Sequence, residues 1–347
     1  MGEPMKIVIC DDEIDRAQDW AERVVAVVPG AQVQHLGGVP FAEAVRDLKL
    51  RMATSAEGAT RGVDEATLID TADILILDSD LTPDRDANIG DDPAGLVATH
   101  LASGLGAEIA HLARTYTTVG AIVIINQDTQ VRTFDLTLTG RQTAIAEVYI
   151  TDDELGEPGL WDPTASTHYR PWVWPALTRI PPLLDAAMAR LRLSDCVSEA
   201  LALGDCSAEL LIGQIETLDL EDGDAVGAMT FEDVAKSSGY GLGLRPREDG
   251  RVGDAHRLRV ALWGTRRWLE RSVLPEQNIL IDLPHLLQRN PWLVSDREDP
   301  ASWDRLARNW DLKAPVVLPD AFNEPASELL GRPVWDVARL PTPCATD

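Results

Sequence analysis

The feature that most constrains the fold is a set of short apolar runs that end in acidic residues. The segment ILILDSD at 74–80 runs four apolar residues directly into two aspartates, and KIVICDDE at 6–13 repeats the pattern near the amino terminus. Unbroken apolar runs of this length are typical of parallel strands that are buried on both faces. We therefore expect a parallel sheet with carboxylates at its carboxyl edge.

Segments with helical periodicity separate these runs along the first half of the chain. This alternation is typical of an α/β fold, in which helices cover both faces of a doubly wound parallel sheet. Five strands are expected, at residues 6–10, 31–36, 74–77, 121–125 and 146–150. Helices are expected at residues 14–28, 41–56 and 94–115.

A change in composition after the fifth expected strand indicates a second domain. The 347 residues exceed the size of one ordinary hydrophobic core. We expect an α/β domain at 1–153, a Trp- and Pro-rich connector at 154–182, and a mainly helical domain at 183–347. Trp161, Trp172 and Trp174 of the connector are expected to pack the domains together. In the second domain, helices are expected at 183–192, 196–203, 208–218 and 255–271, and a strand at 278–282.

The net charge and the cysteine content limit the cellular compartment and the classes of binding partner that we expect for this protein. A net charge of -26 opposes general binding to nucleic acid and to anionic membranes. The four cysteines have no metal-binding spacing, and no apolar segment approaches the roughly 18 residues that a membrane span needs. We expect a cytoplasmic protein.

The acidic residues at the strand ends indicate a metal site. If the first and third strands are neighbours in the sheet, Asp11, Asp12 and Asp78 converge at one edge, with Asp80 close by. Such a group repels itself unless a cation neutralises it, and carboxylate oxygens suit Mg²⁺ or Mn²⁺. The expected metal ligands are these four residues.

Residues 5–152 resemble the receiver domain of bacterial response regulators, through KIVICDDE, DILILDSDL and AGLVATHL. The resemblance implies a flavodoxin-like five-stranded fold that takes part in signal transduction. It also implies that Asp11 and Asp12 bind Mg²⁺, that Asp78 accepts a phosphoryl group from a histidine kinase, and that the Asp80 carbonyl is a further metal ligand.

Two switch positions depart from the family pattern. Asp152 stands where the family has a lysine that holds the phosphoryl group, and Asn126 or Gln127 stands where the family has Ser or Thr. An aspartate repels a phosphoaspartate. We therefore expect the metal half of the site to be kept and phosphoryl transfer to Asp78 to be disfavoured, as in a pseudo-receiver.

The same carboxylates permit a second interpretation. The Asp78-x-Asp80 pair, with Asp11 or Glu13 upstream, also resembles the Toprim-type metal site of nucleases and phosphoesterases. The acidic net charge and the absence of Glu-Gly after the first strand count against it.

The second half offers a basic and aromatic segment but no catalytic motif. Arg257, Arg266, Arg267 and Trp268 could bind an acidic protein surface, or they could belong to an amphipathic helix. Asp282 and His285 could form an acid/base pair. The sequence contains no nucleophile elbow, no H-E-x-x-H and no P-loop, which favours a non-enzymatic role.

These observations favour a regulatory protein that acts through protein–protein contacts. The expected partner is a histidine kinase, or an ATPase or nuclease subunit of a larger assembly such as a defence system. Nucleic acid and membrane are not expected partners.

Overall fold

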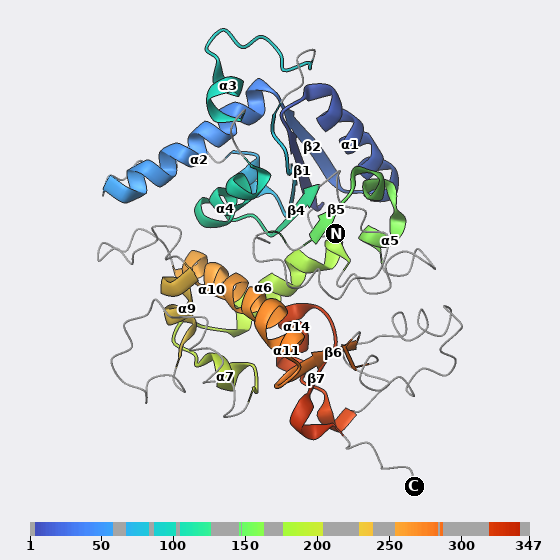
Figure 1. Cartoon of the computed structure of the whole chain (residues 1–347), viewed down its shortest axis with the longest axis vertical. Helices are drawn as coiled ribbons and strands as arrows, with labels where there is room; N and C mark the ends of the chain where they lie inside the picture. Colours follow the sequence, from blue (N-terminus) through green and yellow to red (C-terminus); the bar gives the residue numbers. More distant parts are fainter. Residues whose placement is uncertain are drawn as a thin grey trace.

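The computed structural model describes residues 4–57, 67–82, 87–101, 105–125, 146, 148–162, 176–203, 229–238, 254–283, 285–286 and 319–340. This part of the chain forms an α/β unit followed by a mainly helical unit (Figure 1). The fold class expected from the sequence is therefore confirmed.

The α/β unit is built on a five-stranded sheet in which all neighbouring strands are parallel. Its strands are β1 (Lys6–Asp11), β2 (Gln32–Gly37), β3 (Ile74–Asp78), β4 (Ala121–Ile125) and β5 (Val148–Ile150). The strand order is β2-β1-β3-β4-β5, the order of flavodoxin-like folds. Because β1 and β3 are neighbours, with Cys10 opposite Leu77, their carboxyl ends lie side by side.

Helices cover both faces of this sheet because successive strand residues point to opposite sides. They are α1 (Ile14–Val27), α2 (Val39–Glu57), α3 (Leu96–His100), α4 (Gly106–Tyr116), α5 (Pro158–Trp161) and α6 (Ile180–Arg190), with 3-10 turns η1 (Ile69–Thr71), η3 (Asp152–Gly156) and η4 (Leu177–Arg179). Leu75 packs with α2 and α4, whereas Ile74 packs with α1, α5 and α6. Trp161 of the connector belongs to this second core, and Trp172 and Trp174 lie outside the described residues.

The single helix expected over 94–115 is wrong, because the structure has two separate helices, α3 and α4. Leu105 has an extended backbone and forms a β-bridge with Asp80, which interrupts helical geometry. The next residue, Gly106, lies against the end of β3, where an added Cβ would fall 1.8 Å from the Asp78 carbonyl oxygen. A contact between distant segments therefore fixes where α4 begins.

The second unit is mainly helical and has its own hydrophobic core. Its elements are α7 (Val197–Ala200), α9 (Phe231–Ser238), α10 (Asp254–Trp268), the π-helical turn η6 (Leu269–Val273), α11 (Leu274–Glu276), β6 (Leu280–Asp282), η8 (Pro319–Ala321), α14 (Glu324–Leu330), β7 (Val334–Asp336) and η9 (Val337–Arg339). The expected strand at 278–282 is present as β6, and it pairs antiparallel with β7. The expected helix at 208–218 lies outside the described residues.

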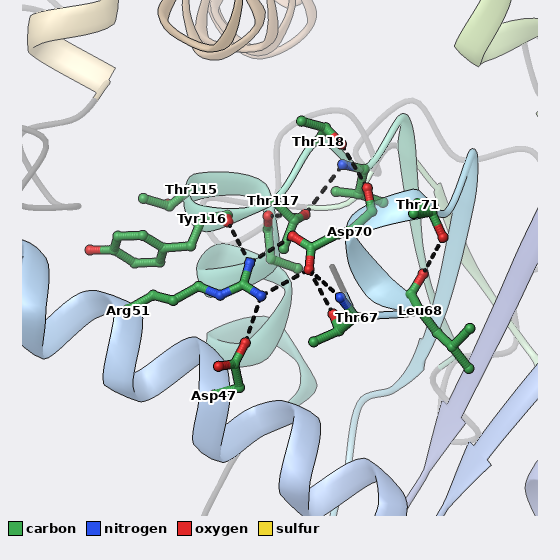
Figure 2. A network of polar contacts seen from close by, with 12 residues as sticks. Asp47, Arg51, Thr67, Leu68, Asp70, Thr71, Thr115, Tyr116, Thr117 and Thr118 are labelled. Carbon is green, nitrogen blue, oxygen red and sulfur yellow. Dashed lines mark hydrogen bonds and ion pairs between the residues drawn. The ribbon is translucent and has the colours of Figure 1, made fainter. Parts of the chain in front are cut away.

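At the amino edge of the sheet, a polar network joins α2, η1 and the end of α4 (Figure 2). Arg51 of α2 donates to both carboxylate oxygens of Asp70, at 2.6 and 2.8 Å, and to the Tyr116 carbonyl oxygen at 3.1 Å. Asp70 also accepts hydrogen bonds from the backbone amide and the hydroxyl of Thr67. The network holds the C-terminal turn of α4 in place.

The helical unit is attached at this same edge. His256 Nε2 of α10 lies 2.7 Å from the Thr115 carbonyl oxygen, so Nε2 must carry the proton. The guanidinium groups of Arg114 and Arg267 both lie over the Trp263 ring, at 5.7 and 5.5 Å from its centroid. The helix α6 contributes side chains to both cores. The carboxyl edge of the sheet, on the opposite side, therefore faces away from the helical unit.

No helix among the described residues combines the length and apolar character needed to cross a membrane.

Candidate functional site

Three carboxylates meet at the carboxyl edge of the sheet. Asp11 is the last residue of β1, Asp12 follows it, and Asp78 is the last residue of β3. Each offers an oxygen atom, and these oxygens all lie within 4.8 Å of one another. All three residues are buried, with at most 2% of their surface exposed. The structure thus brings together three of the four residues that the sequence assigns to a metal.

These carboxylates have few hydrogen-bond donors for their degree of burial. Asp11 Oδ1 accepts a hydrogen bond from the Glu13 amide at 2.7 Å. Among the described residues, Asp11 Oδ2 and both oxygens of Asp12 have no hydrogen-bond partner. Buried carboxylates are normally saturated with hydrogen bonds, so this arrangement is costly unless a proton or a cation completes it.

The protonation equilibria reflect this environment. Burial raises the pKa of Asp11 to about 8 and that of Asp78 to about 6, and it also raises the pKa of Asp12. The charged forms are disfavoured because they are removed from water. Near neutral pH the group is therefore poised between binding protons and binding a cation.

Among the described residues, the cation that reaches this group is Arg16, which sequence reasoning did not identify. Arg16, in the first turn of α1, donates from Nη1 to Asp78 Oδ2 at 3.1 Å. The same nitrogen lies 3.7 Å from Asp11 Oδ2, and Nη2 forms an ion pair with Glu13. The only signal in the sequence is a basic residue five positions after Asp11, which is common at the start of a surface helix.

Asp80, the fourth expected ligand, has its carboxylate outside this group. Its Oδ1 accepts a hydrogen bond from the Thr82 amide at 3.2 Å, and its backbone pairs with Leu105. Asp78 and Asp80 therefore differ in role, because one carboxylate enters the buried group and the other closes a local turn.

The two switch positions are only partly described. Asp152 follows β5 by two residues and begins the turn η3, where its carboxylate lies 3.9 Å from Arg23 Nη1. Its backbone oxygen also accepts a hydrogen bond from Arg23. Asn126 lies outside the described residues. A capping box formed by Thr151 and Glu154 explains why the chain turns directly after β5.

The basic and aromatic residues of α10 do not form one exposed surface. Arg266 and Trp268 are buried, with 3% and 8% of their surface exposed, so the expectation that these two side chains contact a partner is wrong for this conformation. Arg257 forms ion pairs with Glu232 and Asp254. Arg267 lies over Trp263, beside the junction with the first unit. The amphipathic-helix interpretation fits these positions better than a docking patch.

Asp282 and His285 do form a pair, with His285 Nδ1 2.5 Å from Asp282 Oδ1. Arg332 Nε lies 3.8 Å from the other oxygen of Asp282, and the pKa of Asp282 is lowered by its hydrogen bond to His285 and by Arg332. Burial and these ionic contacts make the pair a satisfied part of the second unit rather than an open acid/base site.

The donor set at the carboxyl edge fits a hard divalent cation. It consists of carboxylate oxygens, and Asp12 offers two oxygens to which the described part of the chain donates no hydrogen bond. Mg²⁺ and Mn²⁺ prefer such ligands and retain water molecules at their remaining positions. Asp11, Asp12 and Asp78 are the residues that would hold such an ion.

Comparisons with known proteins add no family to this description, since no family model, curated protein or solved structure matches the chain.

Proposed function

We propose that this chain is a cytoplasmic regulatory protein whose receiver-like α/β unit acts through protein contacts and whose acidic group binds Mg²⁺. One observation carries the proposal. The ends of β1 and β3 bring Asp11, Asp12 and Asp78 together, buried and short of hydrogen bonds, at the edge where ligands of open α/β sheets bind. A purely structural role does not account for buried carboxylate oxygens that lack hydrogen-bond partners among the described residues.

The same site supports regulation that does not depend on phosphoryl transfer. A phosphorylated Asp78 needs cations to balance its added charge. Asp152 occupies the position of the expected lysine and is itself an acid paired with Arg23. Arg16, the cation that does reach Asp78, is shared with Asp11 and Glu13.

The path by which the acidic group influences the helical unit is α4. Its first residue, Gly106, lies against the backbone of Asp78 and Ser79, and the Gly106 amide donates to the Ser79 carbonyl oxygen at 3.0 Å. The other end of α4 carries Thr115 and Arg114, which contact α10. A shift at the end of β3 would therefore move an element that the helical unit contacts directly.

Labelling with a small phosphodonor tests the role of Asp78. The full-length protein is incubated with acetyl phosphate and Mg²⁺, beside a receiver domain that is labelled under the same conditions. We expect the intact mass of this protein to stay unchanged. A phosphoryl adduct that the Asp78→Asn substitution removes would overturn regulation without phosphoryl transfer.

Co-purification tests the role of protein contacts. We expect the tagged full-length protein to recover the same protein partner in the wild-type form and in the Asp78→Asn form. Asp19→Asn, on the exposed face of α1, is the control and should also recover it. Loss of the partner with Asp78→Asn alone would show that the Asp78 carboxylate is required. Failure of every form to recover a protein would contradict the proposal itself.

The nuclease interpretation has weaker support. It requires the carboxylate of Asp80 beside that of Asp78. The Asp80 side chain instead accepts a hydrogen bond from the Thr82 amide. No further observation in the described residues favours it.

A further inference from the structure

The position of Arg16 bears directly on how a cation could enter the acidic group. Its Nη1 lies 3.1 Å from Asp78 Oδ2 and 3.7 Å from Asp11 Oδ2. An ion bound to these two oxygens would lie within a few ångströms of a guanidinium that carries the same sign of charge. The two cations therefore compete for the same pair of oxygens.

Arg16 satisfies only part of the acidic group. Within the described ranges, its ion pairs within 4 Å are to Asp78, Asp11 and Glu13, and none of them is to Asp12. Four carboxylates, counting Glu13, stand against this one guanidinium, which leaves a formal charge of -3 when all are ionised. Arg16 is thus a partial counter-charge, and no described residue donates a hydrogen bond to either oxygen of Asp12.

The side chain of Arg16 also has a way out of the group. It is 26% exposed, whereas the Asp11 and Asp78 side chains are almost fully buried. Its second nitrogen is bound to Glu13, which lies at the rim with 16% of its side chain exposed. Arg16 can therefore leave Asp78 and keep an ionic partner next to the solvent.

We propose that Arg16 is a resident counter-cation that a divalent cation must displace, so that the acidic group alternates between an arginine-occupied and a metal-occupied state. The inference rests on the proposed cation site and adds its regulation. In the first state Arg16 covers Asp78. In the second, Asp11, Asp12 and Asp78 hold the metal, and Arg16 turns with Glu13 toward the solvent. Metal binding thereby changes the charge pattern of the first turn of α1.

Mn²⁺ binding by the full-length protein tests this exchange. Arg16→Gln removes the competing charge, so we expect its Mn²⁺ affinity to rise about tenfold or more above wild type. Arg16→Lys keeps a cation and should stay near wild type. Asp12→Asn should bind more weakly. Arg23→Gln is the matched control, because Arg23 lies two turns further along α1 and pairs with Asp19 and Asp152; its affinity should not change.

A measurement on the wild-type protein covers the case in which Arg16→Gln fails to fold. An arginine-specific reagent followed by peptide mapping reports the accessibility of each guanidinium. We expect Mg²⁺ to speed the modification of Arg16 severalfold and to leave Arg23 unchanged. If Mg²⁺ binds and Arg16 is modified at the same rate or more slowly, the exchange is refuted.

The outcomes also separate this inference from the proposed function. Wild type and Arg16→Gln that bind Mn²⁺ equally, while Asp12→Asn binds less, would overturn the role of Arg16 and leave the cation site standing. Absence of Mn²⁺ binding in every form would overturn the cation site and the exchange together.

Discussion

The two edges of the sheet each place carboxylates beside an arginine, but the carboxylates differ in how many hydrogen bonds they accept. At the amino edge, Asp70 accepts hydrogen bonds from two nitrogens of Arg51 and from the amide and hydroxyl of Thr67. At the carboxyl edge, Asp12 has no hydrogen-bond partner among the described residues, and Arg16 is shared among three acids. The carboxylate at the amino edge is therefore surrounded by hydrogen-bond donors, whereas the carboxylates at the carboxyl edge have few donors among the described residues.

The pKa values follow the same division. The pKa of Asp70 is lowered, because the hydrogen bonds from Arg51 and Thr67 outweigh the effect of burial. Burial dominates at the carboxyl edge and raises the pKa of Asp11 to about 8. The difference teaches that hydrogen-bond donors decide the direction in which the pKa of a carboxylate shifts when the side chain is removed from water.

The largest expected effect is the loss of Asp70. Asp70→Ala leaves Arg51 without its bidentate partner in a side-chain environment that is only 12% exposed. Removing one partner of such a pair should lower the free energy of unfolding by about 2–4 kcal/mol. Urea unfolding measures this loss, and Asp19→Ala, in an exposed ion pair on α1, is the control. A loss below about 1 kcal/mol would contradict a structural role for the amino edge.

At the other edge, the equivalent substitution should have the opposite sign. Asp12→Asn removes a buried charge whose pKa is raised by burial and whose oxygens have no hydrogen-bond partner within the part of the chain that the structure describes, so without divalent cations we expect a gain of about 1–2 kcal/mol in the free energy of unfolding. Mg²⁺ should stabilise wild type and stabilise this variant less. Destabilisation by Asp12→Asn in the presence of a chelator would contradict this, because it would show that the folded protein stabilises the ionised Asp12 carboxylate.

The pH dependence provides a third comparison. Because the folded-state pKa values of Asp11 and Asp78 are raised, to about 8 and about 6, the folded protein holds more protons than the unfolded chain between about pH 4 and 8. Stability from these groups is complete at the acid end and is lost as the pH rises through that window. Asp70 behaves in reverse, since its contribution is present above its ordinary pKa and is lost below it.

Thermal unfolding in a chelator across this pH range measures the trend. We expect the melting temperature of wild type to fall by several degrees from pH 5 to pH 8, and Asp11→Asn to flatten that fall. Asp70→Asn should change the acid side of the profile and leave the alkaline side with its wild-type slope. A flat wild-type profile would mean that the acids at the carboxyl edge are ionised throughout.

Much of the carboxyl edge could be predicted from the sequence because the evidence for it is local. The runs that became β1 and β3 are apolar throughout, and parallel strands place their following residues at one edge. Once the two strands are neighbours, Asp11, Asp12 and Asp78 must converge. The sheet order therefore carries most of the geometry of the site.

The features that the sequence did not reveal depend on contacts between distant segments. The break between α3 and α4 follows from the bridge of Leu105 to Asp80, and β7 is recognisable only through its pairing with β6. The burial of Arg266 depends on how α10 packs in the second core. The role of Arg16 depends on the direction of its side chain, which the helical pattern of α1 does not specify.

The smallest expected effect concerns Asp152, the acid at the start of the turn η3 that follows β5. Its carboxylate lies 3.9 Å from Arg23 Nη1, and both side chains are more than a third exposed. Such pairs contribute about 0–1 kcal/mol, so Asp152→Ala should change the free energy of unfolding by less than about 0.5 kcal/mol. The Mn²⁺ affinity of the Asp152→Ala protein should stay within about twofold of wild type, because solvent screens exposed charges. A severalfold change in the Mn²⁺ affinity of Asp152→Ala would instead show that the Asp152 charge acts on the acidic group. The residue that follows β5 would then belong with Asp11, Asp12 and Asp78 at the carboxyl edge.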